Sequence, residues 1–260
     1  MDNKKYRISV CIIAKPEEDI SKCLDSLEKQ TYPYSEIIVH RQLGRFPELR
    51  NKVIDKAKEE IIAFIDSDCY ADKHWLEEIN NSFKDRTVIG IFGRVSYEFH
   101  GKPPSVSTRI ISNEGNDTMT ANAAFRSKLL KEVRFDEEIN YLEDVILAKR
   151  IKEKGTVNFN KNAVVFHQYQ EWTFKSAVKY AIKVEDFLKA NEKYGLPINK
   201  LGFIINPQHY LIIFFPPSLL IFHSIRSLKD LKIILAIYIE KVYTRILIWK
   251  YAIKNKKIMI

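Results

Sequence analysis

Three short, continuously apolar segments constrain the fold of this chain more than any other feature. Arg7–Ala14, Glu36–Val39 and Ile61–Ile65 are short and rich in β-branched residues, as is typical of strands buried on both faces. Between them, apolar residues recur at helical spacing within Glu18–Gln30 and Leu49–Ala57. Strands that alternate with helices indicate a parallel sheet with helices on its faces, so we expect an α/β fold.

The same periodicities predict the elements that follow. Helices are expected over Trp75–Phe83 and Asp144–Lys154, and a strand over Val88–Val95. Val157–His167 is expected to form a pair of strands, and Phe174–Tyr194 a long amphipathic helix.

The chain changes in composition near Gly195–Lys200, so we expect a main domain of residues 1–198 and a separate region of residues 199–260. Residues 1–200 carry 33 basic and 31 acidic side chains, whereas residues 201–260 carry 9 basic and 2 acidic ones. The second stretch is also the most apolar part of the sequence. Basic and apolar residues together favour a membrane surface over nucleic acid as the partner.

The C-terminal region contains two candidate membrane-contacting segments. Phe203–Ile225 is a run of 23 residues without a formal charge, long enough to cross a bilayer, but its three prolines argue against a straight span. Ile233–Trp249 is apolar but charged in places, which is typical of a helix that lies among lipid headgroups. Packing of both segments on the main domain is the alternative.

Two features of the sequence favour a cytoplasmic location for the main domain. The residues before Arg7 lead into a strand without the pattern of a signal peptide, so we expect the main domain on the cytoplasmic side of the cell membrane. The three cysteines, Cys11, Cys23 and Cys69, have no metal-binding or disulfide spacing, which fits a reducing compartment.

Asp66-Ser67-Asp68 is the sharpest local signal. The two carboxylates follow a predicted central strand, at the edge where open α/β sheets place their ligands. Paired hard oxygen ligands suit Mg²⁺ or Mn²⁺, and such an ion would hold a diphosphate. A turn or a helix cap is the structural alternative for such a tripeptide.

Other residues carry weaker signals. Glu143-Asp144 opens a predicted helix, where acids are favourable on electrostatic grounds alone or where one could act as a general base. His167 follows a strand and is either structural or a third metal ligand. Lys15 and Arg50 are candidates to meet phosphates.

Five blocks of sequence occur in a particular order over residues 7 to 170. They are ISVCIIAK followed by CLDSLEKQTYP and EIIV, then RNKVIDKAKEEIIAFIDSD, TANAAFRSKLLKEVRFDEEI, YLEDVILAKRIKEKG and VVFHQ. Together they resemble the family-2 glycosyltransferases, which have the GT-A-type nucleotide-sugar fold. The resemblance implies a Rossmann-like, mostly parallel sheet sandwiched by helices, here followed by a C-terminal hydrophobic and amphipathic helical region.

The resemblance also implies roles for the acids. Asp66 and Asp68, with His167, would hold a divalent cation, Mn²⁺ or Mg²⁺, and through it the donor diphosphate. Asp144 would deprotonate the acceptor, with Glu143 beside it.

The donor would meet a further set of residues. Carried over in the same way, the nucleotide-sugar would be bound by Ala14, Lys15, His40, Arg50, Asp66, Ser67, Asn122 and Ala123. Within this set Asn122 and Ala123 would line the sugar, and Ala14 and Lys15 would border the base. His40 stands where the family has an acid that reads the base, which leaves donor identity open.

These roles predict an inverting, metal-dependent transfer of one sugar from a nucleotide diphosphate, with a UDP-sugar favoured, to a lipid-linked or cell-surface glycan. The membrane surface is the expected partner of the C-terminal region, which would be peripheral or integral, and nucleic acid is not expected. The oligomeric state is left open. A protein that keeps the fold and binds a nucleotide or a membrane partner without transfer is the alternative. A nucleotidyltransferase is disfavoured, because the residues after Ala14 are acidic rather than glycine-rich and basic.

Overall fold

The computed structural model describes residues 4–98, 118–168, 173–195, 207–218 and 228–255. The described residues form two compact units. Unit 1 holds residues 4–98 and 118–168, and unit 2 holds the three later ranges. The division into functional domains at residues 198 and 199 stays a prediction.

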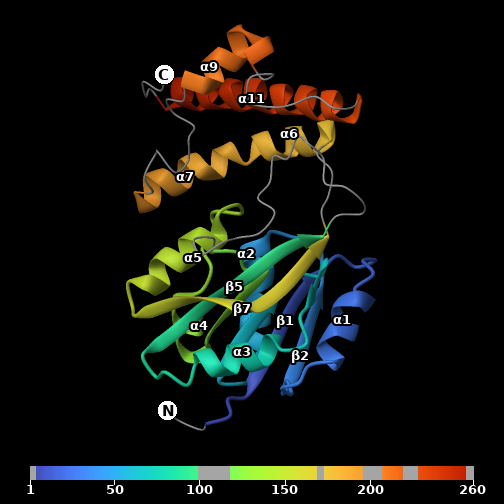
Figure 1. The fold of residues 1–260 in the computed structure, drawn as a ribbon. Helices are drawn as coiled ribbons and strands as arrows, with labels where there is room; N and C mark the ends of the chain where they lie inside the picture. The colour runs from blue at the N-terminus through green and yellow to red at the C-terminus, as the bar shows by residue number, and fades with distance from the viewer. Residues whose placement is uncertain (1–3, 99–117, 169–172, 196–206, 219–227, 256–260) are drawn as a thin grey trace. The chain divides into compact units, whose positions relative to one another are not determined.

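Unit 1 is built from alternating strands and helices (Figure 1). In chain order its elements are β1 (Ile8–Ala14), α1 (Ser21–Glu28), β2 (Glu36–Arg41), α2 (Phe46–Lys56), β3 (Ile61–Ile65), β4 (Cys69–Ala71), α3 (Trp75–Ser82), β5 (Val88–Glu98), β6 (Asn122–Arg126), α4 (Ser127–Val133), α5 (Glu143–Lys152) and β7 (Thr156–Gln168). The apolar runs that predict β1, β2 and β3 start or end within three residues of the observed strands.

The seven strands form one sheet in the order β2-β1-β3-β6-β5-β7-β4. The expectation of a mostly parallel sheet is wrong: β1 pairs in parallel with β2 and β3, and β5 with β7, but β3–β6, β5–β6 and β4–β7 are antiparallel. Two of these antiparallel pairs come from β6, which enters between β3 and β5 in the opposite direction, and the third comes from the short edge strand β4. The first residue of β6, Asn122, therefore lies beside Ile65, the last residue of β3. A sheet with β6 in parallel would place Asn122 at the far edge.

Helices cover both faces of this sheet, as predicted, because strand side chains alternate between the faces. One core cluster packs α1 and α3 against the sheet, with Cys23 and Trp75 fully buried. The other packs α2, α4 and α5 against it, with Ile54 and Leu147 fully buried.

Two predicted elements of the chain differ from the structure. The expected strand pair at Val157–His167 is the single 13-residue strand β7, which runs along β5 with an irregularity between Gly93 and Arg94 instead of turning back. The expected long helix at Phe174–Tyr194 is two helices, α6 (Phe174–Ile182) and α7 (Val184–Tyr194). They separate at Lys183, whose amide hydrogen-bonds the carbonyl of Tyr180 and so tightens the turn there.

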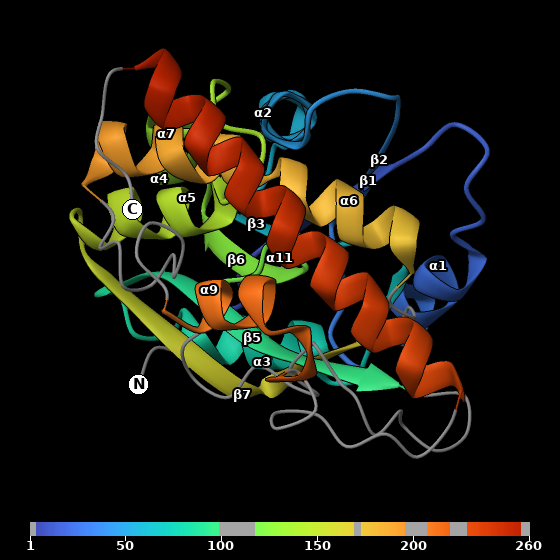
Figure 2. The ribbon, with the colours of Figure 1, turned by 90° about the horizontal axis from the view of Figure 1, so that it is seen from above.

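Unit 2 is helical. Besides α6 and α7 it contains α9 (Pro207–Phe214), the 3₁₀ turn η1 (Pro216–Ser218) and the 27-residue helix α11 (Leu228–Lys254). Helix α11 packs against α6, α7 and α9, and it can be followed along its whole length in Figure 2. The predicted helix at Ile233–Trp249 is therefore confirmed as part of α11.

The predicted segment Phe203–Ile225 lies partly outside the described residues. Its described part contains α9, which ends two residues before Pro216. Among the helices that the structure describes, none combines the length and the hydrophobicity needed to cross a membrane.

Candidate active site

The first acidic motif lies where β3 leaves the sheet. Asp66, Ser67 and Asp68 connect β3 to β4 in a turn closed by a hydrogen bond of 3.0 Å from the Cys69 amide to the Asp66 carbonyl. Because the motif directly follows Ile65, the last residue of β3, both acids lie at the carboxyl end of that strand. Asp66 and Ser67 are partly buried, and Asp68 is exposed.

The antiparallel pairing of β4 with β7 brings His167 to Asp68. Cys69 is the register partner of His167, and Nε2 of His167 lies 3.3 Å from Oδ2 of Asp68. The other ring nitrogen, Nδ1, lies 2.7 Å from the carbonyl oxygen of Gln168, which fixes the orientation of the ring. Asp68, Cys69 and His167 each offer one ligand atom, and these atoms lie within 4.8 Å of one another.

Asp68 and His167 stabilise each other's charged form. Burial opposes ionisation of Asp68, but the hydrogen bond and charge of His167 outweigh it and lower the pKa of this carboxyl. Burial likewise opposes protonation of His167, yet Asp68 raises the pKa of the imidazole. The motif thus keeps an ionised carboxylate at an exposed position.

Arg50 connects this motif to the second one. Its guanidinium is ion-paired with Oε1 of Glu143 through Nη1, and Nη2 lies 3.5 Å from Oδ1 of Asp66. Arg50 is 5% exposed, so the pairing takes place away from water. Contact of Arg50 with a phosphate stays a prediction; in the structure its guanidinium already holds two carboxylates.

Contacts made by Arg50 and by the next residue, Asn51, hold this guanidinium in position. Phe46 and Phe135 each have their ring centroid 5.5 Å from the Arg50 guanidinium carbon. Asn51 exchanges two hydrogen bonds with the backbone of Phe135, of 2.9 and 3.0 Å. These contacts tie α2 to the segment that follows α4, so the position of Arg50 is fixed from both sides.

The second acidic motif begins α5. Leu142, directly before it, has φ of 73°, a left-handed conformation that L-residues rarely adopt. Glu143 and Asp144 then occupy the first turn, where the helix dipole favours acids. Glu143 is buried by its pairing with Arg50, and Asp144 is partly exposed.

Asp144 differs from Asp68 in its ionisation. Burial and, after it, the charge of Glu143 raise the pKa of Asp144 to about 7, although Arg50 acts in the opposite direction. The charge of Asp66 also raises the pKa of Asp144. A carboxylate whose pKa lies near neutrality is suited to accept a proton.

The structure places Asn122 and Ala123 in the core of the sheet. The Asn122 amide accepts a hydrogen bond of 2.8 Å from Nε1 of Trp75 and donates to the carbonyl oxygens of Arg94 and Ala163. Gly93 leaves room for this amide, because a Cβ there would lie 2.4 Å from it. Ala123 is buried as well. Their contact with a donor sugar stays a prediction.

The residues predicted to border the nucleotide base lie at the ends of β1 and β2. Ala14 is buried and pairs in register with Arg41, whose guanidinium donates to the carbonyl oxygens of Lys15, Pro16 and Glu18. Arg41 therefore holds the loop that follows β1. His40 lies on the adjacent strand position and contacts Gln42 and Lys56 at 3.1 and 3.3 Å.

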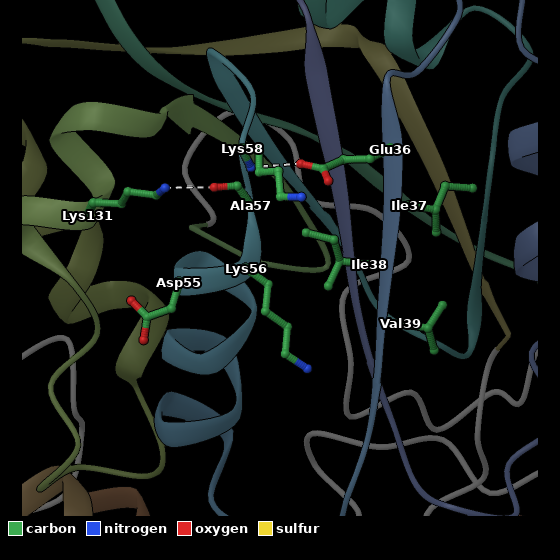
Figure 3. Close-up of a pocket in the computed structure, with 9 residues that line it drawn as sticks. All are labelled: Glu36, Ile37, Ile38, Val39, Asp55, Lys56, Ala57, Lys58 and Lys131. Carbon is green, nitrogen blue, oxygen red and sulfur yellow. Dashed lines mark hydrogen bonds between the residues drawn. The ribbon is translucent and has the colours of Figure 1, made fainter.

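A separate groove of about 640 Å³ lies along β2 and the C-terminal end of α2 (Figure 3). It runs from Glu36, which pairs in register with Ser9 early in β1, to Val39. This position is toward the end of the strands opposite to Asp66. Glu36 in this groove is engaged by Ser9 and by the Lys58 amide.

Sequence reasoning missed two features of the site. The spacing of Cys69 in the sequence gives no sign of metal binding, and the residue is buried in the core, but it also faces Asp68 and His167 because β4 pairs with β7. Arg50 is singled out for a different contact. The burial of Arg50 between two phenylalanines depends on residues 85 positions apart, so no local pattern reveals it.

Comparison with known proteins agrees with these observations. The model of glycosyl transferase family 2 matches residues 44–136, from the loop before α2 to the segment after α4. This segment includes Arg50, Asp66 and Asp68. By sequence, no curated protein matches the chain.

Solved structures share the fold. The crystal structure of TarS from S. aureus is similar with a TM-score of 0.50 and 15% identity, covering 92% of this chain but only 54% of that one. A 1–349 fragment of TarS in complex with UDP-GlcNAc gives a TM-score of 0.51 at 15% identity, with 91% of each chain covered. Its complex with UDP gives 0.50 at 14% identity, covering 96% of this chain and 92% of the fragment. The chain thus spans about half the length of the longer TarS chain.

Proposed function

We propose that this chain is a family-2 glycosyltransferase, which moves a single sugar from a nucleotide diphosphate to an acceptor hydroxyl with inversion at the anomeric carbon. The observation that carries the proposal is the meeting of two acidic motifs at one edge of the sheet. Asp66 and Glu143 are both bound by Arg50, while Asp68 and Asp144 remain partly or fully exposed beside them. Transfer needs a group that manages the leaving diphosphate and a group that accepts the acceptor's proton, and these two acids can supply them.

The donor set near Asp68 fits a divalent cation. Asp68 and His167 offer a carboxylate oxygen and an imidazole nitrogen of the kind that Mn²⁺ accepts, and their ligand atoms lie close enough to share one ion. Burial raises the pKa of the Cys69 thiol, so we expect Asp68 and His167 to hold the ion. When bound, it would offset the negative charge of the leaving diphosphate.

Asp144 is the proposed proton acceptor. As the acceptor oxygen bonds to the anomeric carbon, its proton passes to the Asp144 carboxylate, and the bond from that carbon to the diphosphate oxygen breaks. Glu143 cannot take this role while it is ion-paired with buried Arg50. Arg50 instead holds Glu143 in place, so that Asp144, the next residue, stays at the site.

A UDP-sugar is the proposed donor. Support comes from the TarS fragment, whose structures are complexes with UDP-GlcNAc and with UDP. The ends of β1 and β2, where Lys15 and His40 lie, are the proposed position of the uracil ring. His40 contributes a ring nitrogen where the family has an acid.

A lipid-linked or cell-surface glycan is the proposed acceptor, at the cytoplasmic side of the cell membrane. The basic and apolar character of residues 201–260 supports this proposal, because such a region favours contact with a membrane surface.

Donor binding tests the proposal directly. Calorimetric titration of the full chain with UDP-GlcNAc, UDP-glucose, UDP-galactose and GDP-mannose, each with and without Mn²⁺, is expected to give metal-dependent binding of one UDP-sugar. Asp68→Asn should weaken that binding in the presence of Mn²⁺. Asp25→Asn removes an exposed carboxylate on α1 and is the matched control.

Release of UDP, measured in the same samples, separates transfer from binding alone. Slow release of UDP from the bound donor, lost in Asp144→Asn while donor affinity is kept, would support the enzyme. Metal-dependent binding without UDP release, whichever acceptors are added, would favour a nucleotide-binding protein that does not transfer sugar. If the folded chain bound no donor, both the transferase and the nucleotide-binding protein would be ruled out.

A further inference from the structure

Helix α11 carries a continuous row of apolar side chains along one side. The row, called the outer stripe here, consists of Leu228, Leu231, Leu235, Ile239, Val242, Ile246, Trp249 and Ile253. Successive members are three or four residues apart, so all eight fall within about 80° of the helix circumference and extend over about 38 Å. Six of them are exposed, and Ile239 and Val242 are partly exposed.

The outer stripe is not the face by which α11 packs into unit 2. That face is already covered: Ile233, Ile234 and Ile237 pack with Ile212 of α9. Farther along, Leu247 and Ile248 pack with residues of α7. The helix is therefore apolar on two sides, of which one is covered within unit 2. An exposed apolar surface of this length indicates a binding partner.

The charges on α11 are segregated in the same way. Its two acids, Asp230 and Glu240, are both 3% exposed. Glu240 is engaged by Thr244 and Lys241. Lys232 and Lys250, which follow the edge of the outer stripe, are exposed, as is Lys254 at the end of the helix. The charges that α11 presents beside the stripe are consequently cationic.

We infer that the outer stripe of α11 docks on the surface of a bilayer that contains anionic lipid, with the helix lying parallel to it. The apolar side chains would enter the boundary between headgroups and acyl chains, and the lysines would contact the lipid phosphates. Trp249 lies within the stripe, and tryptophan is enriched at this depth of a membrane.

The charge pattern favours this partner over a second copy of the chain. Two outer stripes placed together would bring the lysines of one helix toward those of the other. Glu240 and Asp230 are buried on the opposite side and cannot pair with them. An anionic lipid surface removes this conflict, because it supplies the negative charge that the helix lacks.

Flotation with vesicles tests the inference without reference to sugar transfer. The full chain is mixed with vesicles of phosphatidylcholine and phosphatidylglycerol, or of phosphatidylcholine alone, and the floating fraction is measured. We expect binding to the mixed vesicles, much weaker binding to phosphatidylcholine, and loss of part of the binding at about 1 M salt, where charges are screened beyond about 3 Å.

Two pairs of variants separate the apolar and the cationic contributions. Leu235→Glu with Ile246→Glu should abolish flotation, whereas Leu43→Glu, at an exposed leucine of unit 1, should not change it. Replacing Lys232, Lys250 and Lys254 by Gln should weaken binding to the mixed vesicles by roughly a hundredfold. The control replaces the exposed Lys73, Lys128 and Lys152 by Gln, with the same charge change and little effect.

Each remaining outcome overturns the inference. A chain that does not float and sediments as a dimer, which Leu235→Glu returns to a monomer, would make the stripe a contact between copies. A monomer that does not float, with an unchanged circular dichroism spectrum, would show that the stripe does not dock on lipid. Equal binding to both vesicle types would remove the role of the lysines. UDP-sugar binding is measured separately and is expected to be the same in all variants.

Discussion

The two acidic motifs of unit 1 differ in origin but share one arrangement. Asp66-Ser67-Asp68 lies in a turn between two strands, and Glu143-Asp144 lies in the first turn of a helix. In each motif one acid contacts buried Arg50, namely Asp66 or Glu143. The other acid of each motif, Asp68 or Asp144, is exposed or partly exposed. One buried cation thus lies between the two acidic motifs and lowers the repulsion between Asp66 and Glu143.

The remaining acids respond to their surroundings in opposite ways. The pKa of Asp68 is lowered by His167, whereas the pKa of Asp144 is raised by burial and by Glu143. Two carboxylates whose pKa values are moved apart are typical of a site with two roles. An ionised Asp68 suits cation binding, and Asp144 suits proton transfer.

Loss of Asp144 should have the largest effect on turnover. In Asp144→Asn we expect the transfer rate to fall by about two to four orders of magnitude, the usual contribution of a positioned base. The affinity for a UDP-sugar should stay nearly unchanged. Single-turnover kinetics with calorimetry measures both quantities, and Asp25→Asn is the control. If Asp144→Asn kept full turnover, Asp144 would not be the proton acceptor, and the two motifs would not differ in role as proposed.

Loss of Arg50 should damage both motifs at once. Arg50→Met leaves the carboxylates of Asp66 and Glu143 without their shared cation, which should lower the free energy of unfolding by about 3–5 kcal/mol. Urea unfolding measures it. Arg7→Met breaks an ion pair in which the arginine side chain is 71% exposed, so its effect should be within about 1 kcal/mol.

A milder change would sharpen the same result. Arg50→Lys keeps the charge but cannot contact two carboxylates with a fixed fork, so its stability should lie between wild type and Arg50→Met. Equal stability of Arg50→Met and Arg7→Met would mean that Arg50 does not hold the motifs together.

The raised pKa of Asp144 predicts a pH dependence. With a pKa of about 7, Asp144 is protonated below neutrality, so the transfer rate should fall about tenfold for each pH unit below about 6. The residual rate of Asp144→Asn should lack this dependence. A wild-type rate that is constant from pH 5 to about 8 would contradict the assignment.

The free energy of unfolding should depend on pH in the opposite sense to the transfer rate. Because the folded-state pKa of Asp144 lies above its unfolded value, the folded chain binds this proton more tightly and is stabilised at low pH. The contribution is complete below the unfolded pKa near 3.8 and is lost as pH rises through about 7. The difference in unfolding free energy between wild type and Asp144→Asn should therefore decrease over that range. Urea unfolding of both proteins at several pH values checks it.

Local patterns predict part of this fold. The continuous apolar runs predict β1, β2 and β3, and helical spacing predicts α1, α2 and α3, because each pattern reflects burial of the element itself. Strand β4 has three residues, too few for a periodic pattern, and β6 is rich in small residues. The direction of β6 depends on its neighbours β3 and β5, so the sequence pattern alone suggests a parallel sheet where the structure has a mixed one.

The site shows the same limit. Motif order singles out Asp66, Asp68, Asp144 and His167, and the structure brings Asp68 to His167 and, through Arg50, Asp66 to the start of α5. Two features depend on tertiary structure instead. The position of Arg50 requires Phe135, and the start of α5 requires Leu142 in a left-handed conformation.

Substitution of Leu142 should give the smallest change in stability, and it tests the backbone conformation directly before Glu143-Asp144. A left-handed conformation costs an L-residue about 1–2 kcal/mol, and glycine adopts it freely. Leu142→Ala and Leu142→Gly both remove the side chain, so their difference reports the backbone alone. We expect Leu142→Gly to be more stable by about 1 kcal/mol in urea unfolding.

The same pair of substitutions at Leu129 should give the opposite order. Leu129 lies within α4, where alanine is favoured over glycine by about 1 kcal/mol. Reversal of the order between the two positions would show that the chain turns left-handed at Leu142 and begins α5 at Glu143. If alanine were favoured at both positions, Leu142 would not adopt the left-handed conformation, and α5 would not begin at Glu143. The backbone would then not set the position of the second motif in the way that the structure indicates.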